Sequence, residues 1–553
     1  VDALLQVSLP GMDELAAYLE MAAWIEHRRY GCIVVDTAPT GHALRLLTMP
    51  ALVQRWLMAL DALLAKHRYL RRRFGGDTTE DHLDGFLLAL ERSRRTLADL
   101  LQDRQRCRFV PVTLAERMSL AETDDLLSCL REHQVPMTDI IVNRVCPSSA
   151  CVGRAAGADL CGVCLAERRR QLAALAAQAA HDAGARTWGL PLLPDEPRGS
   201  HLSGLWRRLE RLDTLADHAP PPAPLPVHVE RPVPLPPPGL RLLILAGKGG
   251  VGKTTLACAT ALHLNRRRPQ QRILLFSTDP AHSLADALGQ PVGSSPSAVR
   301  PGLDAQDVDA ETAFGAIRAA YREELSQLLD RHLGSIDITF DREVMERLLD
   351  LAPPGLDEVM ALTTAMEHLD GGRYDVIVLD AAPSGHLLRL LELPELIADW
   401  LRLFFELLLK YRNLLRMPGL SERLVSLSRS VKRLRALLAD PHRTRVQLVS
   451  VATELGLAET ADLAAGLAEL SIAVSALALN QLRPPADGNC HCALCSRLRA
   501  SEAQRIHDAE RRFERLHRVL IYRQQEPQGV DGLAALGACL LYTSDAADDS
   551  VLV

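Results

Sequence analysis

Short apolar runs alternate along this chain with longer segments of helical character. In the C-terminal half the runs are RLLILAG (241–247), RILLFS (272–277), YDVIVLD (374–380) and SALAL (475–479). Continuous apolar runs of this length are typical of parallel strands buried on both faces, and the segments between them predict helical crossovers. The pattern is therefore typical of an α/β fold with a parallel sheet. No apolar run approaches the ~20 residues that a membrane-spanning helix needs.

A tandem duplication underlies the sequence. Residues 10–50 align without a gap on residues 354–394, and 19 of these 41 positions are identical. The match continues between residues 109–123 and 446–460, and Asn143 corresponds to Asn480. Such self-similarity indicates a repeated structural unit. We therefore expect two tandem copies of one fold in a single polypeptide.

The duplication predicts four segments. Residues 1–217 form a first half that lacks a phosphate loop and a first switch segment, so we expect it to be truncated at its N-terminal side. Residues 218–239 form a linker, because ten prolines fall between 220 and 238 and favour a semi-rigid extended chain. Residues 240–538 form a complete second half. Residues 539–553 have no counterpart in the first copy, and we expect a non-native read-through tail there.

Composition narrows the class of protein. The 553 residues carry 63 Lys and Arg against 69 Asp and Glu, a net charge of −6. This balance does not predict the basic surface of a nucleic-acid-binding protein. Twelve cysteines are too few for a disulfide scaffold of this length, and the CxxC pairs among them indicate metal or redox chemistry in a reducing compartment.

A glycine-rich loop carries the most specific chemistry. GKGGVGKTT (247–255) follows an apolar strand and precedes a helix rich in Ala and Leu, the context that a phosphate loop requires. Backbone amides of the loop and the positive end of the helix would bind phosphate. Lys253 would reach the β- and γ-phosphates, and the Thr254 hydroxyl would ligate Mg²⁺. The predicted nucleotide-binding residues here are Gly247, Lys248, Gly249, Gly250, Val251, Gly252, Lys253, Thr254 and Thr255.

Lys248 makes this loop a variant form. A second lysine so early in the loop is badly placed to fold back onto its own phosphates. We expect Lys248 to serve catalysis across an interface with the other half, so the duplication would make the chain an intramolecular pseudo-dimer.

Two aspartates follow apolar strands, at the edge where parallel sheets bind ligands. Asp279 follows RILLFST and would orient the attacking water or hold Mg²⁺ through water, although a helix N-cap is the alternative. Asp380 ends YDVIVLD and would hold Mg²⁺ as a Walker B acid. Ser384, Gly385 and His386 then begin a loop placed to sense the γ-phosphate, although a packing role is the alternative for His386.

Together with GKGGVGKTT, the segments STDPAHSLADAL (277–288) and DAAPSGHLLRLL (380–391) resemble the ArsA/GET3 family of ATPases. The resemblance covers the chain apart from the linker and the tail. It implies a P-loop NTPase fold with a doubly wound, mostly parallel α/β core and a helical subdomain insertion in each half that handles cargo, and ATP and Mg²⁺ as ligands.

The resemblance also assigns residues to roles. It places Asp279 and His282 in the first switch segment, and it places Asp380, Pro383, Ser384, Gly385 and His386 in the second. Asp36 corresponds to Asp380 and would hold Mg²⁺ in the first half, with Cys32 inside the strand before it. The residues implied at the base are Asn480 and Asn143, which contact adenine, and Glu526 and Pro527, whose loop closes over it.

The cysteine pairs Cys161/Cys164 and Cys492/Cys495 occupy matching places in the two halves. By resemblance to the targeting branch of the family they would form a closed, structural Cys₄ zinc site between the halves. Reduced thiols without metal, or a redox-switchable pair, are the alternatives. The nearby Cys146, Cys151 and Cys490 leave the ligand set open.

A three-thiolate arsenite site of the kind found in the pump branch cannot be assembled here. Residues 259–489 contain no cysteine, and residues 1–106 contain only Cys32. Residues 52–73 and 396–417 form strongly apolar predicted helices with basic ends. They would either line a groove for a hydrophobic peptide helix or pack as ordinary core helices.

The sequence thus predicts an ATPase that couples closure of its two halves to transport or delivery of a membrane-associated substrate, arsenical-pump-like in architecture. Its partner would be a membrane transporter subunit or a hydrophobic membrane-protein client, with no nucleic acid. We expect a cytoplasmic protein that associates peripherally with a membrane partner. The alternatives are a chaperone that targets tail-anchored or other hydrophobic membrane proteins, and a nucleotide-dependent scaffold of the chromosome-partitioning type.

Overall fold

The computed structural model divides the chain into two compact units, which are described separately here. The first unit takes its residues from Val1–Cys107, Asp309–Asp370 and Arg389–Leu437, and the second from the remainder. The structure describes residues 12–37, 54, 57–58, 82–147, 161–178, 185–212, 227–278, 283–308, 323, 356–381, 388, 418–485, 492–523, 527 and 529–542.

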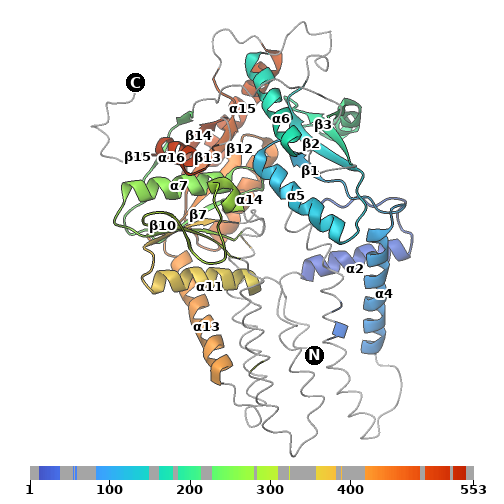
Figure 1. Ribbon diagram of the computed structural model, residues 1–553, viewed down its shortest axis with the longest axis horizontal. Helices are drawn as coiled ribbons and strands as arrows, with labels where there is room; N and C mark the ends of the chain where they lie inside the picture. Colours follow the sequence, from blue (N-terminus) through green and yellow to red (C-terminus); the bar gives the residue numbers. More distant parts are fainter. Residues whose placement is uncertain are drawn as a thin grey trace, which may run out of the picture. The chain divides into compact units, whose positions relative to one another are not determined.

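The described part of the first unit is helical and draws on both halves of the sequence. Its main helices are α2 (Met12–Glu26), α4 (His82–Gln102), α11 (Leu356–Asp370) and α13 (Pro418–Leu438), all labelled in Figure 1. Ala22 of α2 packs with Leu90 and Leu97 of α4. This composition agrees with the expected helical insertions. The apolar segment 396–417 lies outside the described residues, and of 52–73 only 54, 57 and 58 are described.

The second unit contains a nine-stranded sheet built from the second half, in the order β5-β14-β13-β12-β7-β11-β8-β10-β9. All neighbours are parallel except the edge strands β5 and β9, which run antiparallel to β14 and β10. The strands are β5 (Val229–Glu230), β7 (Leu242–Gly247), β8 (Ile273–Ser277), β9 (Ser297–Arg300), β10 (Leu303–Asp307), β11 (Val376–Asp380), β12 (Thr444–Val451), β13 (Val474–Leu482) and β14 (His517–Tyr522).

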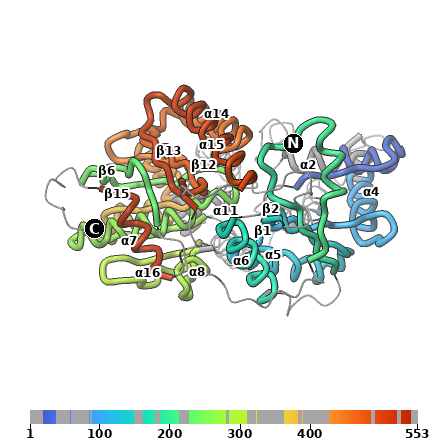
Figure 2. The backbone as a smooth tube through the Cα atoms, turned by 90° about the horizontal axis from the view of Figure 1, so that it is seen from above, coloured from blue at the N-terminus to red at the C-terminus, as the bar shows by residue number. Residues whose placement is uncertain are grey.

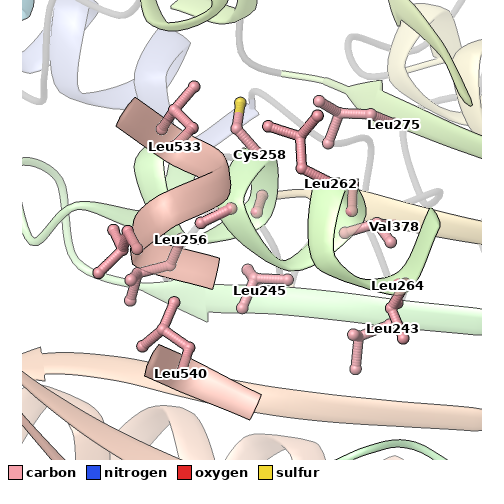
Figure 3. Close-up of a cluster of buried hydrophobic side chains, with 14 of the residues drawn as sticks. Leu243, Leu245, Leu256, Cys258, Leu262, Leu264, Leu275, Val378, Leu533 and Leu540 are labelled. Carbon is pink, nitrogen blue, oxygen red and sulfur yellow. The ribbon is translucent and has the colours of Figure 1, made fainter. Parts of the chain in front are cut away.

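Helices cover both faces of this sheet. Leu243 and Leu245 of β7 belong to a core cluster that contains residues of α7 (Lys253–Arg267) and α16 (Gly529–Leu540), and Figure 3 shows Leu256, Leu533 and Leu540 as members of it. On the opposite face, α14 (Glu454–Glu469) lies over β12. The short α8 (Ser283–Leu288) and the long α15 (Ala493–Arg512) complete the described helices of this half. The predicted doubly wound α/β fold is therefore confirmed.

Two helices fit so closely that one lacks a side chain at their contact. α7 and α16 lie side by side in both Figure 1 and Figure 2. A Cβ atom at Gly537 of α16 would lie 2.2 Å from the carbonyl oxygen of Ala259 in α7. The same α7 surface buries His263, which is 1% exposed. This contact fixes α7, whose N-terminus carries the phosphate loop.

The first half contributes a smaller sheet with the order β1-β2-β3-β4. Its strands are β1 (Val112–Leu114), β2 (Asp139–Val145), β3 (Arg186–Pro191) and β4 (Glu210–Arg211), flanked by α5 (Arg117–Glu132), α6 (Gly162–Gln178) and the 3₁₀ helix η2 (Gly199–Arg208). The parallel trio β1-β2-β3 repeats the order of β12-β13-β14.

Equivalent hydrogen bonds recur in the two halves at a constant sequence offset. Thr123 Oγ1 donates to Thr113 Oγ1 over 2.8 Å, and Thr460 Oγ1 donates to Ser450 Oγ over 2.8 Å. The offset is 460 − 123 = 450 − 113 = 337. The duplication seen in the sequence is thus preserved in local geometry.

One expected strand is not formed. Residues 32–37, which include Cys32 and Asp36, have no regular structure, and Val34 is 90% exposed. In the second half the equivalent strand β11 lies between β7 and β8. Among the described residues of the first half no such neighbours flank this apolar segment, so its backbone groups have no strands to pair with.

Parts of the predicted linker and tail belong to the second unit. Within 218–239, β5 extends the large sheet and β6 (Val233–Pro234) pairs with β15 (Leu541–Tyr542). Leu540 and Leu541 are buried in the core cluster, so the fold continues past 538. Residues 213–226 and 543–553 lie outside the described residues, and the outer limits of linker and tail stay predictions. No helix among the described residues is long and apolar enough to cross a membrane.

We expect the stability of the protein to fall in weak acid because of His263. Burial and the charges of Arg266 and Arg267 lower the pKa of His263 from 6.5 to about 4. Between these values the unfolded chain binds a proton that the folded chain does not. The free energy of unfolding should therefore decrease by about 3 kcal/mol as the pH falls from 6.5 to 4. Urea denaturation across this pH range measures the change.

His263→Gln should remove this part of the pH dependence, because the amide does not titrate. His442→Gln, at an exposed site, is the matched control and should leave the profile as in the wild type. A His263→Gln profile identical to that of the wild type would contradict the assignment.

Candidate functional site

The glycine-rich loop joins the central strand β7 to α7, and its glycines are required sterically. A Cβ at Gly247 (φ 159°) would lie 2.1 Å from the carbonyl oxygen of Val449 in β12. Gly250 (φ 73°) and Gly252 (φ 93°) adopt left-handed conformations that favour glycine. The loop therefore follows a path that leaves its backbone close to the neighbouring strand and to the start of α7. Gly249, Val251 and Thr255 lie on the same path.

The positive end of α7 and a buried lysine make this loop suited to binding an anion. α7 begins at Lys253, which is 6% exposed, and its amino group donates to the carbonyl oxygen of Lys248 over 3.0 Å. The first amides of a helix have no intrahelical acceptor, so they attract phosphate oxygens. The residues present fit a nucleotide phosphate.

A hydroxyl and a carboxylate meet beside the loop. Thr254 Oγ1 donates to Asp380 Oδ2 over 2.7 Å, and Asp380 at the end of β11 is 1% exposed. Hydroxyl and carboxylate oxygens are ligands that suit Mg²⁺. The pair therefore fits the predicted Mg²⁺ role, in which Thr254 and Asp380 would hold the ion.

A further buried acid was not anticipated from the sequence. Asp307 ends β10 and is 2% exposed, and it is level with Ser277 of β8, which is in turn level with Asp380 of β11. Its signal in the sequence was weak, because LDAQD is a short segment with few apolar residues. Its place at the carboxyl edge makes it a candidate second acid of the site.

Several predicted site residues cannot be placed. Those that lie outside the described residues are Asp279, His282, Pro383, Ser384, Gly385, His386 and Glu526. Pro527 is described and lies against α16, where Gly532 approaches it. Asp36 is exposed and follows no strand.

The two asparagines assigned to adenine occupy equivalent positions near the ends of β2 and β13. Asn143 Oδ1 accepts from the Arg144 amide over 2.9 Å, and Asn480 Oδ1 accepts from the Gln481 amide over 2.8 Å. Arg144 and Gln481 both have positive φ, at 59° and 61°. In the second half the Asn480 amide also donates to Val251 O over 2.8 Å, so this side chain supports the phosphate loop directly.

Lys248, the lysine that makes the loop a variant, pairs within its own half. Its Nζ lies 2.7 Å from Glu459 Oε1 of α14, and the Lys248 side chain is 45% exposed. To reach a nucleotide in another half, Lys248 would have to leave Glu459. An exposed pair of this kind contributes little to stability, so the cost of leaving is small.

Four cysteine thiols, two from each half, form a compact cluster. Sγ–Sγ distances are 3.5 Å for Cys161–Cys495, 3.9 Å for Cys164–Cys492 and 3.3 Å for Cys164–Cys495, and all four atoms lie within 4.8 Å of one another. Four sulfurs about 2.3 Å from one tetrahedral Zn²⁺ would be about 3.8 Å apart. All four are free thiols, three of them buried, so the donor set fits a closed zinc site. Cys146 is described but lies outside this group of four, whereas Cys151 and Cys490 lie outside the described residues.

The thiols of this cluster differ in how readily they ionise. Cys492 is the N-cap of α15, where the helix dipole favours a thiolate, whereas a shared hydrogen bond with Cys146 raises the pKa of Cys164. Burial opposes ionisation of Cys492, but backbone hydrogen bonds from Cys495 and Cys161 outweigh it and lower the pKa of Cys492 to about 7. A shared hydrogen bond with Cys164, and burial, raise the pKa of Cys495. Cys164 and Cys495 therefore hold protons that a metal would displace.

Ion pairs also join the two halves within the second unit. Arg523, next to the loop assigned to the base, lies 3.1 Å from Glu167 of α6 and 3.3 Å from Glu116. Arg198 in the first half lies 3.0 Å from Glu454 of α14. The Arg523 side chain is only 18% exposed, so its pairs are less screened than those at the surface. The two halves therefore contact through both thiols and charges.

Known proteins match nearly the whole chain. A family model described as anion-transporting ATPase matches residues 2–204 and 240–542. ATPase ARSA1 of Chlamydomonas reinhardtii is 29% identical over 585 residues, covering 96% of this chain and 68% of that protein. A Halobacterium salinarum protein named as an arsenical pump-driving ATPase is 28% identical, covering 96% of this chain and 79% of its own length. ATPase GET3 of Mycosarcoma maydis is 33% identical over 46% of this chain and 76% of its own length.

We expect Gly247→Ala to weaken ATP binding by at least about tenfold, because the added Cβ forces β7 and β12 apart by more than the loop can absorb. Gly250→Ala is the matched control, since a Cβ there meets nothing within 4 Å and adds only backbone strain. Titration with a fluorescent ATP analogue measures both. The steric argument is wrong if Gly250→Ala is the weaker binder.

Proposed function

Because the chain belongs to the anion-transporting ATPase family, we propose that ATP-driven closure of its two halves powers the transport or delivery of a membrane-associated substrate. The chain is an ArsA/GET3-type ATPase. The observation that carries the proposal is the buried Thr254–Asp380 pair beside the glycine loop, at the centre of the parallel sheet.

The proposed roles in hydrolysis follow the geometry of this edge. Lys253 neutralises charge on the β- and γ-phosphates, and Thr254 and Asp380 hold Mg²⁺, which supplies charge stabilisation when bound. Asp279 orients the attacking water. Lys248 leaves Glu459 and serves the opposite half during closure.

We propose that the base is held at the far end of the same edge. Asn480, which already supports Val251, contacts adenine, and the loop with Glu526 and Pro527 closes over it. Asn143 and Asp36 are the corresponding residues of the first half. Pro383, Ser384, Gly385, His386 and His282 form the segments that sense the γ-phosphate.

The share of this chain that each relative aligns with favours a pump-like architecture. ARSA1 and the arsenical pump-driving ATPase align with both halves of this chain, whereas the GET3 match spans about one half. We therefore propose a membrane transporter subunit as the first candidate partner. A hydrophobic membrane-protein client is the second, and the thiol cluster that joins the halves favours it. The net charge of −6 does not favour a partitioning-type scaffold or nucleic acid. A cytoplasmic location with peripheral membrane association completes the proposal.

Two assays separate pump from chaperone. Stimulation of phosphate release by arsenite or antimonite supports the pump, and retention of a co-expressed hydrophobic tail segment during purification supports the chaperone. If the protein shows neither response, the result contradicts coupling to a membrane-associated substrate.

Lys253→Ala should abolish ATP hydrolysis, because the phosphates lose the buried ammonium of Lys253, which contacts the loop. A phosphate-release assay on purified protein should show turnover below about 1% of the wild type. The control is Lys432→Ala, at an exposed position of α13, which should hydrolyse ATP at the wild-type rate. Retained turnover in Lys253→Ala would refute the assignment.

The protein should bind one Zn²⁺ per chain at the four thiols. Cys164→Ser and Cys495→Ser each remove one buried ligand, and each should weaken zinc binding by more than the 10–100-fold typical of an outer-shell change. Cys129→Ser in α5 is the control and should bind as the wild type does. Competition with a chromophoric chelator measures the affinity. Stoichiometric zinc binding by the Cys164→Ser/Cys495→Ser protein would exclude this site.

A further inference from the structure

The C-terminal end of β13 forms hydrogen bonds with the phosphate loop. Asn480 donates to Val251 O over 2.8 Å, and Gln481 Nε2 donates to Gly250 O over 3.2 Å. These two carbonyl groups belong to the turn that places the loop amides. A shift of residues 480–481 would therefore change where the amides point.

Two residues further on, the same strand end contacts the thiol cluster. Arg483 Nη1 lies 3.2 Å from Cys495 Sγ and 3.7 Å from Cys164 Sγ. One guanidinium thus donates to a cysteine from each half. Its hydrogen bonds join opposite charges when the sulfurs are thiolates, and they are weaker when the sulfurs are neutral thiols.

The connection between these contacts is short and firmly held. A register shift interrupts the ladder between Leu479 and Leu482, and Gln481 has a φ of 61°. Leu482 is 1% exposed, and the Arg483 amide donates to Glu502 Oε2 over 2.9 Å. A packed segment of this kind transmits displacement rather than absorbing it.

The first half does not repeat this arrangement. At the offset of 337, Arg483 corresponds to Cys146 and Gln481 corresponds to Arg144. The Cys146 amide is held by Gln171, as the Arg483 amide is held by Glu502, so the backbone is conserved between the halves while the side chains differ. The guanidinium contact to the thiols therefore belongs to the half that has the glycine loop.

We propose that residues 480–483 couple metal binding at the four thiols to nucleotide binding at the glycine loop, with Arg483 as the positioning residue. The inference rests on the proposed zinc and nucleotide sites. Zinc fixes all four sulfurs as thiolates with a net charge of −2, which strengthens the hold on Arg483. A fixed Arg483 keeps Gln481 and Asn480 against the loop. By thermodynamic linkage, nucleotide must strengthen zinc binding by the same factor.

The test measures both affinities in the full chain. Zn²⁺ dissociation constants are determined by chelator competition with and without Mg²⁺ and a slowly hydrolysed ATP analogue, and nucleotide affinity is determined with and without Zn²⁺. We expect each ligand to tighten the other about fivefold or more in the wild type. The coupling ratio of a ligand is its affinity with the other ligand present divided by its affinity without it. In Arg483→Met the coupling ratios of zinc and of nucleotide should both fall to one, and zinc binding should be 10–100-fold weaker.

Gln481→Ala tests the other end of the connection and does not alter the thiol contacts. Its zinc affinity without nucleotide should stay within about twofold of the wild type while the coupling ratio falls toward one. Arg511→Met, at an exposed position of α15, is the matched control and should keep the wild-type ratio. If Arg483→Met does not fold, as judged by circular dichroism, Gln481→Ala decides.

Two results would overturn the inference and leave the proposed sites intact. One is a wild-type protein that binds both ligands but has a coupling ratio of one. The other is a coupling ratio in both Arg483→Met and Gln481→Ala that equals that of the wild type. A wild-type protein that binds no zinc would disprove the metal site itself, and the inference with it.

Discussion

A close approach between two buried strands sets the geometry of the site. Where β7 ends, the carbonyl oxygen of Val449 in β12 occupies the space that a side chain would need. Only glycine is compatible with that contact, and the loop that follows Gly247 leads into α7 at Lys253. The start of α7 then lies at the sheet edge where Asp380 ends β11. The phosphate loop, the lysine and the acidic pair therefore all depend on how tightly the central strands pack.

Features with a local cause could be predicted from the sequence. The glycine loop, the acid after YDVIVLD and the CxxC pairs each depend on a few consecutive residues in a recognisable context. The parallel strands and the helices between them followed because continuous apolar runs have few other uses in a protein of this size. These are the parts of the fold for which local pattern and global structure agree.

Features that depend on distant partners could not be predicted. CIVVD has the composition of a strand, but a strand needs neighbours, and the described part of the first half supplies none around residues 32–36. The pairing of Lys248 with Glu459 joins positions 211 residues apart and has no sequence signal. The expected non-native tail included Leu541, because the tail has no counterpart in the first copy. In the structure Leu541 is buried and pairs with β6.

Placing both copies of the fold in one polypeptide removes a constraint that a symmetric dimer must obey. In a dimer of identical chains, any residue beside the thiols appears twice, so a single arginine there would face its own copy. Here Cys146 and Arg483 occupy equivalent positions with different chemistry. Gene duplication followed by fusion thus permits two equivalent positions beside one shared cluster to evolve different side chains.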